Sequence, residues 1–241
     1  MSNTPELIRQ VNAYEETSIV FSGDWTSPEA TILLGAWQRA MALDHKLPRE
    51  LQDLEGMSGK KYRYTMNNIV GSIPDARYLE IGVCAGSTTC SAIWGNKCKV
   101  LCIDNWSEWG GPKDAFFNNI NYCKTDDIDF SFIESDYKQV DFSSVGQYNV
   151  YMYDGPHTEQ DQYDAIDLVE PALDDVYILA VDDYNWGRVR QGTERALEKC
   201  GHKVLAKIEV RTCQVDEVHP VVSHQFSDWH NGYLLAVVSK K

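Results

Sequence analysis

The sequence lacks any apolar stretch that could cross a membrane. Its longest uninterrupted apolar runs, Val176 to Val181 and Tyr233 to Val238, contain six residues each, whereas a membrane-spanning helix needs roughly 20. The first residues, Met1 to Glu6, carry neither the basic start nor the apolar core of a secretory signal. We therefore expect a cytoplasmic protein that does not enter a membrane.

Basic residues are scarce. The 241 residues include 22 Lys and Arg against 36 Asp and Glu, which gives a net charge of −14. The segment from Asp154 to Asp183 holds ten carboxylates and no Lys or Arg. Because such a chain repels phosphate backbones and anionic lipids, we expect neither a nucleic acid nor a membrane as its partner. A cation is a better partner for these carboxylates.

Paired cysteine motifs are also absent. The seven cysteines are an odd number and include no Cys-x-x-Cys pair, which argues against a disulfide scaffold. Several of them lie in apolar stretches, so we expect buried thiols that pack as small hydrophobic side chains. A zinc site at Cys98 and Cys102 is the alternative.

From Arg77 onward, short apolar runs alternate with helical segments, such as Thr158 to Leu173 and Arg188 to Cys200. This order predicts βαβ units, in a mostly parallel sheet with helices on both faces. Seven strands are expected, over residues 77–81, 99–103, 129–133, 148–153, 176–181, 203–208 and 233–238.

Residues 1–70 have a different pattern. Two segments, Thr31 to Leu43 and Tyr62 to Val70, have helical spacing, but the region has too few apolar residues for a core of its own. We therefore predict a helical N-terminal cap over residues 1–70 and one α/β domain over residues 71–241. Within that domain, the connection Gln214 to Gly232 is long and rich in His, Asp and Trp, and long connections of this kind are often lids or partner surfaces.

A glycine turn follows the first predicted strand. Gly82 and Gly86 allow a tight turn and the close approach of a ligand to the backbone, and the helix after them directs unpaired N–H groups toward that ligand. The dinucleotide fingerprint Gly-x-Gly-x-x-Gly is not met, because position 84 is Cys. This disfavours NAD binding, and a plain tight turn is the other alternative.

The pattern Glu80-x-Gly82-x-x-x-Gly86-x-Thr88 resembles motif I of the class I S-adenosylmethionine-dependent methyltransferases. Asp104 ends the second strand 22 residues after Gly82, where a carboxylate can accept both ribose hydroxyls. The resemblance implies a Rossmann-like seven-stranded sheet with an antiparallel last strand. It also implies cofactor contacts from Glu80, Gly82, Gly86, Ser87, Thr88, Asp104, Ser135, Asp136 and Asp154.

Three carboxylates, Asp154 among them, follow two adjacent strands. Asp154 ends the fourth strand, and Asp182 and Asp183 end the fifth. Because the carboxyl ends of parallel strands converge, these side chains would repel one another unless a hard cation joined them. The pattern is similar to the metal-dependent, macrocin-type sugar O-methyltransferases, and this resemblance implies that the three hold Mg²⁺. The alternative is that these carboxylates bind no metal ion and instead cap the following helices or lie in solvent.

The acid that can serve as the base in the macrocin-type enzymes has no direct counterpart in this sequence. Its members carry a second acid two residues after the first metal-binding Asp, whereas this chain has Pro156. His157 is the available substitute, because imidazole can accept a proton at neutral pH, and we expect it to act beside Asp154 in catalysis. A histidine that only forms a hydrogen bond in the turn is the alternative.

The sequence thus predicts an S-adenosylmethionine-dependent methyltransferase that methylates a hydroxyl group of a small, sugar-like molecule with the help of Mg²⁺. A catalytically silent cofactor-binding or partner-binding module and an NAD(P)-dependent oxidoreductase stay as alternatives. The sequence does not distinguish a monomer from a homo-oligomer.

Overall fold

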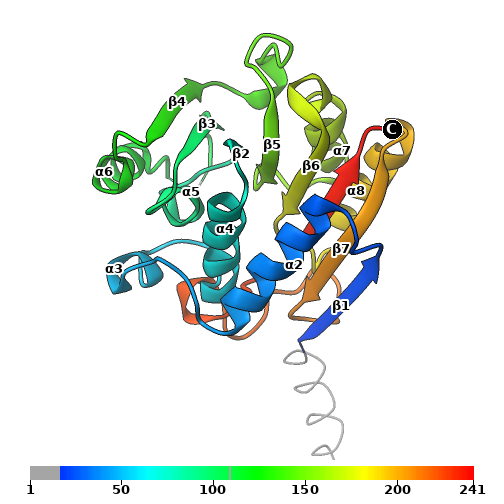
Figure 1. The fold of residues 1–241 in the computed structure, drawn as a ribbon, viewed down its shortest axis with the longest axis horizontal. Helices are drawn as coiled ribbons and strands as arrows, with labels where there is room; N and C mark the ends of the chain where they lie inside the picture. Colours follow the sequence, from blue (N-terminus) through cyan, green and yellow to red (C-terminus); the bar gives the residue numbers. More distant parts are fainter. Residues whose placement is uncertain (1–16, 109) are drawn as a thin grey trace, which may run out of the picture.

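The computed structural model describes residues 17–108 and 110–241. In this part of the chain, eight strands form one sheet in the order β1-β7-β8-β6-β5-β2-β3-β4 (Figure 1). The strands are β1 (Ser18–Gly23), β2 (Ala76–Ile81), β3 (Cys98–Asp104), β4 (Ile128–Glu134), β5 (Tyr148–Tyr153), β6 (Leu173–Val181), β7 (Lys203–Arg211) and β8 (Tyr233–Ser239). Strands β2 to β6 are parallel, and β8 lies antiparallel between β6 and β7. The predicted Rossmann-like sheet with an antiparallel last strand is confirmed.

Helices and short 3₁₀ turns connect the strands. They are α2 (Pro28–Met41), α3 (Arg49–Gln52), α4 (Lys60–Ser72), α5 (Ser87–Ile93), α6 (Lys113–Cys123), η1 (Tyr137–Gln139), α7 (Glu159–Asp167), η2 (Glu170–Ala172), α8 (Gly187–Lys199) and η3 (His224–Phe226). Among the described helices, none has both the length and the apolar character needed to span a bilayer.

The strands bury side chains on both faces of the sheet. Val150 and Tyr151 are neighbours on β5, and they belong to two different hydrophobic clusters because successive side chains point to opposite faces. Residues of α2, α4, α5 and α6 complete the first cluster, and residues of α7 and α8 complete the second. Figure 1 shows α2 and α4 in front of the sheet and α7 and α8 behind it.

The N-terminal region contains the two predicted helices but is not entirely helical. Ser18–Gly23 forms β1, which pairs antiparallel with β7 at the edge of the sheet. The prediction of seven strands and of a purely helical cap is therefore wrong at this segment. Its apolar run, Ile19 to Phe21, is too short to show a period, and its strand conformation depends on the partner that β7 provides. Residues 1–16 of the predicted cap lie outside the described residues.

The helix predicted over residues 158–173 ends earlier than expected. Thr158 caps α7 by accepting a hydrogen bond from the backbone N–H of Asp161 at 3.1 Å. However, α7 ends at Asp167, and Leu173 already belongs to β6. Pro171 stands between them in η2, where its missing N–H and fixed φ prevent the helix from continuing.

The seven cysteines are all free thiols. Five are buried, and Cys84 and Cys200 are half-buried. Cys98 and Cys102 lie on β3 and belong to neither of the potential metal-binding groups found among the described residues. The packing role predicted for the cysteines is confirmed, and the zinc alternative is not supported.

Candidate functional site

The glycine turn after β2 lies directly against the end of β5. Gly82 has a φ of +82°, and a Cβ atom there would lie 2.0 Å from the carbonyl oxygen of Asp154. Both the left-handed backbone and the close approach therefore require glycine. The turn is held in addition by Asp104, whose carboxylate accepts hydrogen bonds from the backbone N–H groups of Val83 at 2.8 Å and Cys84 at 3.2 Å.

A cavity of about 660 Å³ opens at the carboxyl ends of β2 to β6, as expected for a ligand site in an open α/β sheet. Eight of the predicted site residues line it: Gly82, Asp104, Ser135, Asp136, Asp154, His157, Asp182 and Asp183. Residues that we predicted for the cofactor and for the metal ion thus share one cavity.

Four predicted cofactor residues lie outside the cavity lining: Glu80, Gly86, Ser87 and Thr88. Glu80 is buried beneath the turn, where it accepts hydrogen bonds from the hydroxyl groups of Tyr78 and Thr89, both at 2.7 Å. Burial raises the pKa of this carboxyl to about 7. These bonds give Glu80 a structural role, since they tie β2 to α5.

Side chains that could bind a metal ion gather at one side of the cavity in two overlapping groups, whose ligand atoms lie within 4.8 Å of one another: Asp154, His157 and Asp182, and Asp182, Asp183 and His230. The Nε2 atom of His157 lies 3.7 Å from Asp154 Oδ1 and 3.7 Å from Asp183 Oδ2. Asp183 has a φ of +56°, a left-handed conformation that is strained for a residue with a Cβ atom and is typical of functional sites. The convergence expected from the strand order is therefore present.

Asp182 and Asp183 are buried, whereas the side chains of Asp154 and His157 are 23% and 20% exposed. Burial, followed by repulsion from Asp182, raises the pKa of Asp154 well above its usual range, and burial followed by repulsion from Asp183 does the same for Asp182. Asp182 Oδ1, Asp183 Oδ1 and His157 Nε2 are buried without a hydrogen-bond partner. Unpartnered buried carboxylate oxygens fit a divalent cation, because its charge would offset both the repulsion and the desolvation.

His230 completes the cluster, and the sequence did not indicate its place beside Asp183. Its Nε2 atom lies 4.0 Å from Asp183 Oδ1, and its Nδ1 atom accepts a hydrogen bond from the backbone N–H of His224 at 3.0 Å. Burial lowers the pKa of His230 to about 3. His230 also forms, with Asp182 and Asp183, one of the groups of side chains that could hold a metal ion.

The long connection between β7 and β8 covers one side of the cavity. His219, Ser223, His224 and His230 from this connection line it, as expected for a lid rich in histidine. Trp186 lies at the same wall, and its ring is 5.1 Å from that of His219 and 5.6 Å from that of His157. The acidic cluster therefore faces a wall of aromatic and imidazole rings.

No family model and no curated protein matched the sequence. Among solved structures, cofactor-bound Rv0187 from MTB is similar over 98% of both chains, with 15% identity and a TM-score of 0.53. TrmN from Thermus thermophilus matches 74% of this chain with 12% identity and a TM-score of 0.50. SMU.776, a candidate methyltransferase complexed with SAH, matches 75% with 13% identity and a TM-score of 0.51.

The chain spans about half the length of TrmN and of SMU.776, since the match covers 48% of each. Identities this low show a shared fold. The order of the strands, the glycine turn and the position of the cavity agree with that fold. The chain therefore has the class I fold of S-adenosylmethionine-dependent methyltransferases.

Proposed function

We propose that this protein transfers a methyl group from S-adenosylmethionine to a hydroxyl oxygen of a small molecule. The observation that carries this proposal is the shared cavity, which brings together Asp104 at the glycine turn and the cluster of Asp154, His157 and Asp182. Methyl transfer needs a donor and an acceptor in line and a base for the acceptor proton, and one cavity with both sets of groups can satisfy that need.

The lining residues suggest how the cofactor lies. Asp104 is suited to the ribose hydroxyls, and Ser135 and Asp136, which follow β4, are suited to the adenine amino group. With the nucleoside there, the sulfonium is directed along the turn at Gly82 toward the acidic cluster. S-adenosylhomocysteine in the similar SMU.776 complex supports the choice of cofactor.

Asp154, Asp182 and Asp183 are the residues that would hold a divalent cation, and we propose Mg²⁺, as in the macrocin-type group that the sequence resembles. The unpartnered oxygens of Asp182 and Asp183 support this assignment. When bound, such an ion lowers the pKa of a coordinated hydroxyl group and orients it. His230, whose Nε2 atom lies 4.0 Å from Asp183 Oδ1, is a further candidate ligand at this side of the cluster.

His157 is the proposed base, with Asp154 placed beside it. Burial lowers the pKa of His157, so the ring is neutral near pH 7 and can accept a proton. In the proposed step, the acceptor oxygen forms a bond to the methyl carbon while the carbon–sulfur bond breaks. His157 Nε2, which has no hydrogen-bond partner, receives the hydroxyl proton.

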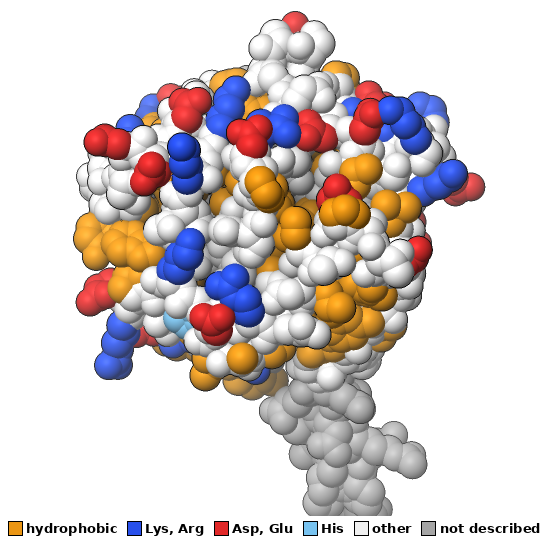
Figure 2. Space-filling model, viewed as in Figure 1, with side chains coloured by type: hydrophobic (Ala, Val, Ile, Leu, Met, Phe, Trp, Pro, Cys, Tyr) orange, Lys and Arg blue, Asp and Glu red, His pale blue; other side chains and the backbone are white. Residues whose placement is uncertain are grey.

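A small, sugar-like hydroxylated molecule is the proposed acceptor. On the face shown in Figure 2, Lys and Arg side chains are interspersed with Asp and Glu side chains and form no continuous basic patch. Together with the net charge of −14, this disfavours a nucleic acid as the substrate. Carboxylates and rings such as Trp186 suit a polyhydroxyl compound, which can bind a metal ion and pack against an aromatic face.

Calorimetry and a turnover assay test the proposal. S-adenosylhomocysteine should bind at micromolar affinity and NAD(H) should not; the reverse result would favour the oxidoreductase alternative. Formation of S-adenosylhomocysteine is then measured across a panel of sugars and other polyols, with Mg²⁺ or with EDTA. His157→Gln should bind the cofactor normally and lose about 10²-fold or more in turnover. Cofactor binding without turnover across the panel would favour the silent binding module.

A further inference from the structure

The connection between β7 and β8 has an outer segment, residues 214–226, in which none of the residues is buried. This outer segment still lines the cavity with three side chains, His219, Ser223 and His224. The chain is fixed at both ends of it, because the buried Asn185 Nδ2 donates to Thr212 Oγ1 at 2.9 Å and to Asn231 Oδ1 at 2.8 Å. Since few buried contacts hold the outer segment itself, it can open while its ends and the sheet stay in place.

Polar contacts join the outer segment to the start of α8. The carboxylate of Asp216 accepts a hydrogen bond from the backbone N–H of Gly187 at 2.5 Å and lies 3.5 Å from Arg190 Nη2. The next residue, Glu217, forms an ion pair with Arg188. The side chains of Arg188 and Glu217 are 42% and 43% exposed, so water and salt weaken their attraction. The contact between the outer segment and α8 is therefore a reversible one.

The same arginine supports the turn that carries the proposed base. Arg188 Nε donates to the backbone carbonyl oxygen of His157 at 2.8 Å. The Cζ atom of Arg188 lies 4.3 Å from the centre of the Trp186 ring, and that ring is 5.6 Å from the ring of His157. One side chain thus contacts both the outer segment and the turn at His157.

We propose that Arg188 is a positioning residue, which links the closure of the outer segment to the placement of His157. The inference rests on the proposed function, in which His157 receives the proton of the acceptor. With Glu217 paired to Arg188, the outer segment encloses one side of the cavity while the guanidinium holds the carbonyl of His157. When the ion pair separates, a small molecule can enter or leave, and the guanidinium loses a contact that orients it. The base is therefore fully supported only in the closed cavity.

The exchange of two protons with solvent, followed by NMR, tests this link without an acceptor. The backbone N–H of Gly187 reports the contact with Asp216, and the Nε–H of Arg188 reports the contact with His157. In Glu217→Gln, which removes one charge of the ion pair, both protons should exchange about fivefold faster or more. In the double variant Arg188→Glu, Glu217→Arg, the reversed ion pair should return the exchange at Gly187 to within about twofold of the wild type.

Glu159→Gln is the matched control. Glu159 pairs with Arg195 of the same helix at 2.5 Å, and the two side chains are 42% and 46% exposed. Arg195 also lies over an aromatic ring, that of Tyr163 at 4.7 Å. Because Glu159 is two residues from His157, this variant also controls for a change of charge near the proposed base. It should leave the exchange of both protons unchanged.

Turnover gives a second measurement, with an acceptor identified in the panel of sugars and polyols. Arg188→Gln should lower kcat about tenfold or more, because the base is misplaced, while the Kd of S-adenosylhomocysteine should change by less than about twofold. A normal kcat in this variant would overturn the inference.

Two exchange results would also overturn the inference while leaving the proposed function intact. Faster exchange at Gly187 alone in Glu217→Gln would show that the outer segment opens without affecting the turn at His157. Unchanged exchange of both protons would show that the ion pair does not hold the outer segment. Absence of turnover by the wild type across the panel would instead count against the proposed function, and the exchange measurement would still decide whether Arg188 links the two segments.

Discussion

The carboxylate of Asp104, at the end of β3, accepts a hydrogen bond from the backbone N–H of Val83 at 2.8 Å. The same side chain also accepts from the N–H groups of Cys84 at 3.2 Å and Trp106 at 2.7 Å. The acid that the sequence marks as a ribose ligand therefore also shapes the glycine turn. Its role in the turn and its proposed role at the ribose affect different measurements.

Asp104→Ala should weaken the binding of S-adenosylhomocysteine by at least about 1–3 kcal/mol, because hydroxyl groups and backbone N–H groups lose their acceptor. It should also lower the Tm, since three backbone bonds are lost. Calorimetry and thermal unfolding measure the two effects. Asp126→Ala, at an exposed position in the loop before β4, should change neither. Normal affinity in Asp104→Ala would mean that the ribose lies elsewhere.

Gly82→Ala should destabilise the protein by about 3 kcal/mol or more and abolish cofactor binding. The new Cβ atom would lie 2.0 Å from the carbonyl oxygen of Asp154, and the φ of +82° is strained for alanine. Urea unfolding provides the measurement. Gly35→Ala is the matched control, because nothing lies within 4 Å of its Cβ position within α2. There, better helix propensity should stabilise the protein by about 0.5–1 kcal/mol.

Millimolar Mg²⁺ should raise the Tm of the wild-type protein, because a ligand that binds only the folded state stabilises it by about 2.7 kcal/mol at 100 times its Kd. The double variant Asp182→Asn, Asp183→Asn should lose this response. In EDTA it should melt at a higher temperature than the wild type, since the repulsion between buried carboxylates is gone.

The control for this experiment is Asp126→Asn, Asp127→Asn, which makes the same change of charge at two exposed positions. This variant should keep the Mg²⁺ response. If the variant at 182 and 183 responds to Mg²⁺ as the wild type does, the ion is not bound by these carboxylates.

Glu80 should make the stability depend on pH. Its pKa is raised from 4.5 to about 7 by burial, so the folded state retains a proton that the unfolded state has released. Relative to Glu80→Gln, the wild type should therefore lose stability as the pH rises from about 5 to 8, by roughly 1–3 kcal/mol. Urea unfolding of both proteins at several pH values measures the difference. A difference that is constant with pH would show that Glu80 ionises normally.

Features set by neighbouring residues could be predicted from the sequence. The cap at Thr158, the glycines at 82 and 86 and the end of α8 near Gly201 all follow from local backbone and hydrogen-bond chemistry. The mostly parallel sheet could be predicted from the alternation of β and α segments, whereas the antiparallel last strand was implied by the family resemblance. For the same reason, the sequence placed Asp154 and Asp182 at one edge of the sheet.

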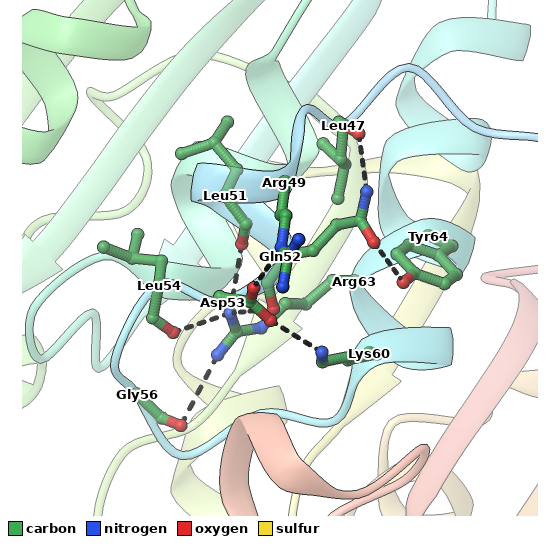
Figure 3. Close-up of polar contacts among 10 residues, drawn as sticks. All are labelled: Leu47, Arg49, Leu51, Gln52, Asp53, Leu54, Gly56, Lys60, Arg63 and Tyr64. Atoms are coloured by element: carbon green, nitrogen blue, oxygen red, sulfur yellow. Dashed lines mark hydrogen bonds and ion pairs between the residues drawn. The ribbon is translucent and has the colours of Figure 1, made fainter.

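Only the tertiary structure decided which residues meet across long distances in the chain. Ser18–Gly23 is a strand because β7 lies beside it, and His230 faces Asp183 because the connection between β7 and β8 folds back over the cavity. The buried side chain of Arg63 on α4 gave no sequence signal either, since arginine on a helix is usually exposed. Its hydrogen-bond partners are close in sequence, between 5 and 12 residues away, but they lie on a loop whose path the packing of the cap determines (Figure 3). Local backbone and hydrogen-bond chemistry thus specified the helices, the strands and the glycine turn, whereas tertiary packing decided which side chains surround the site.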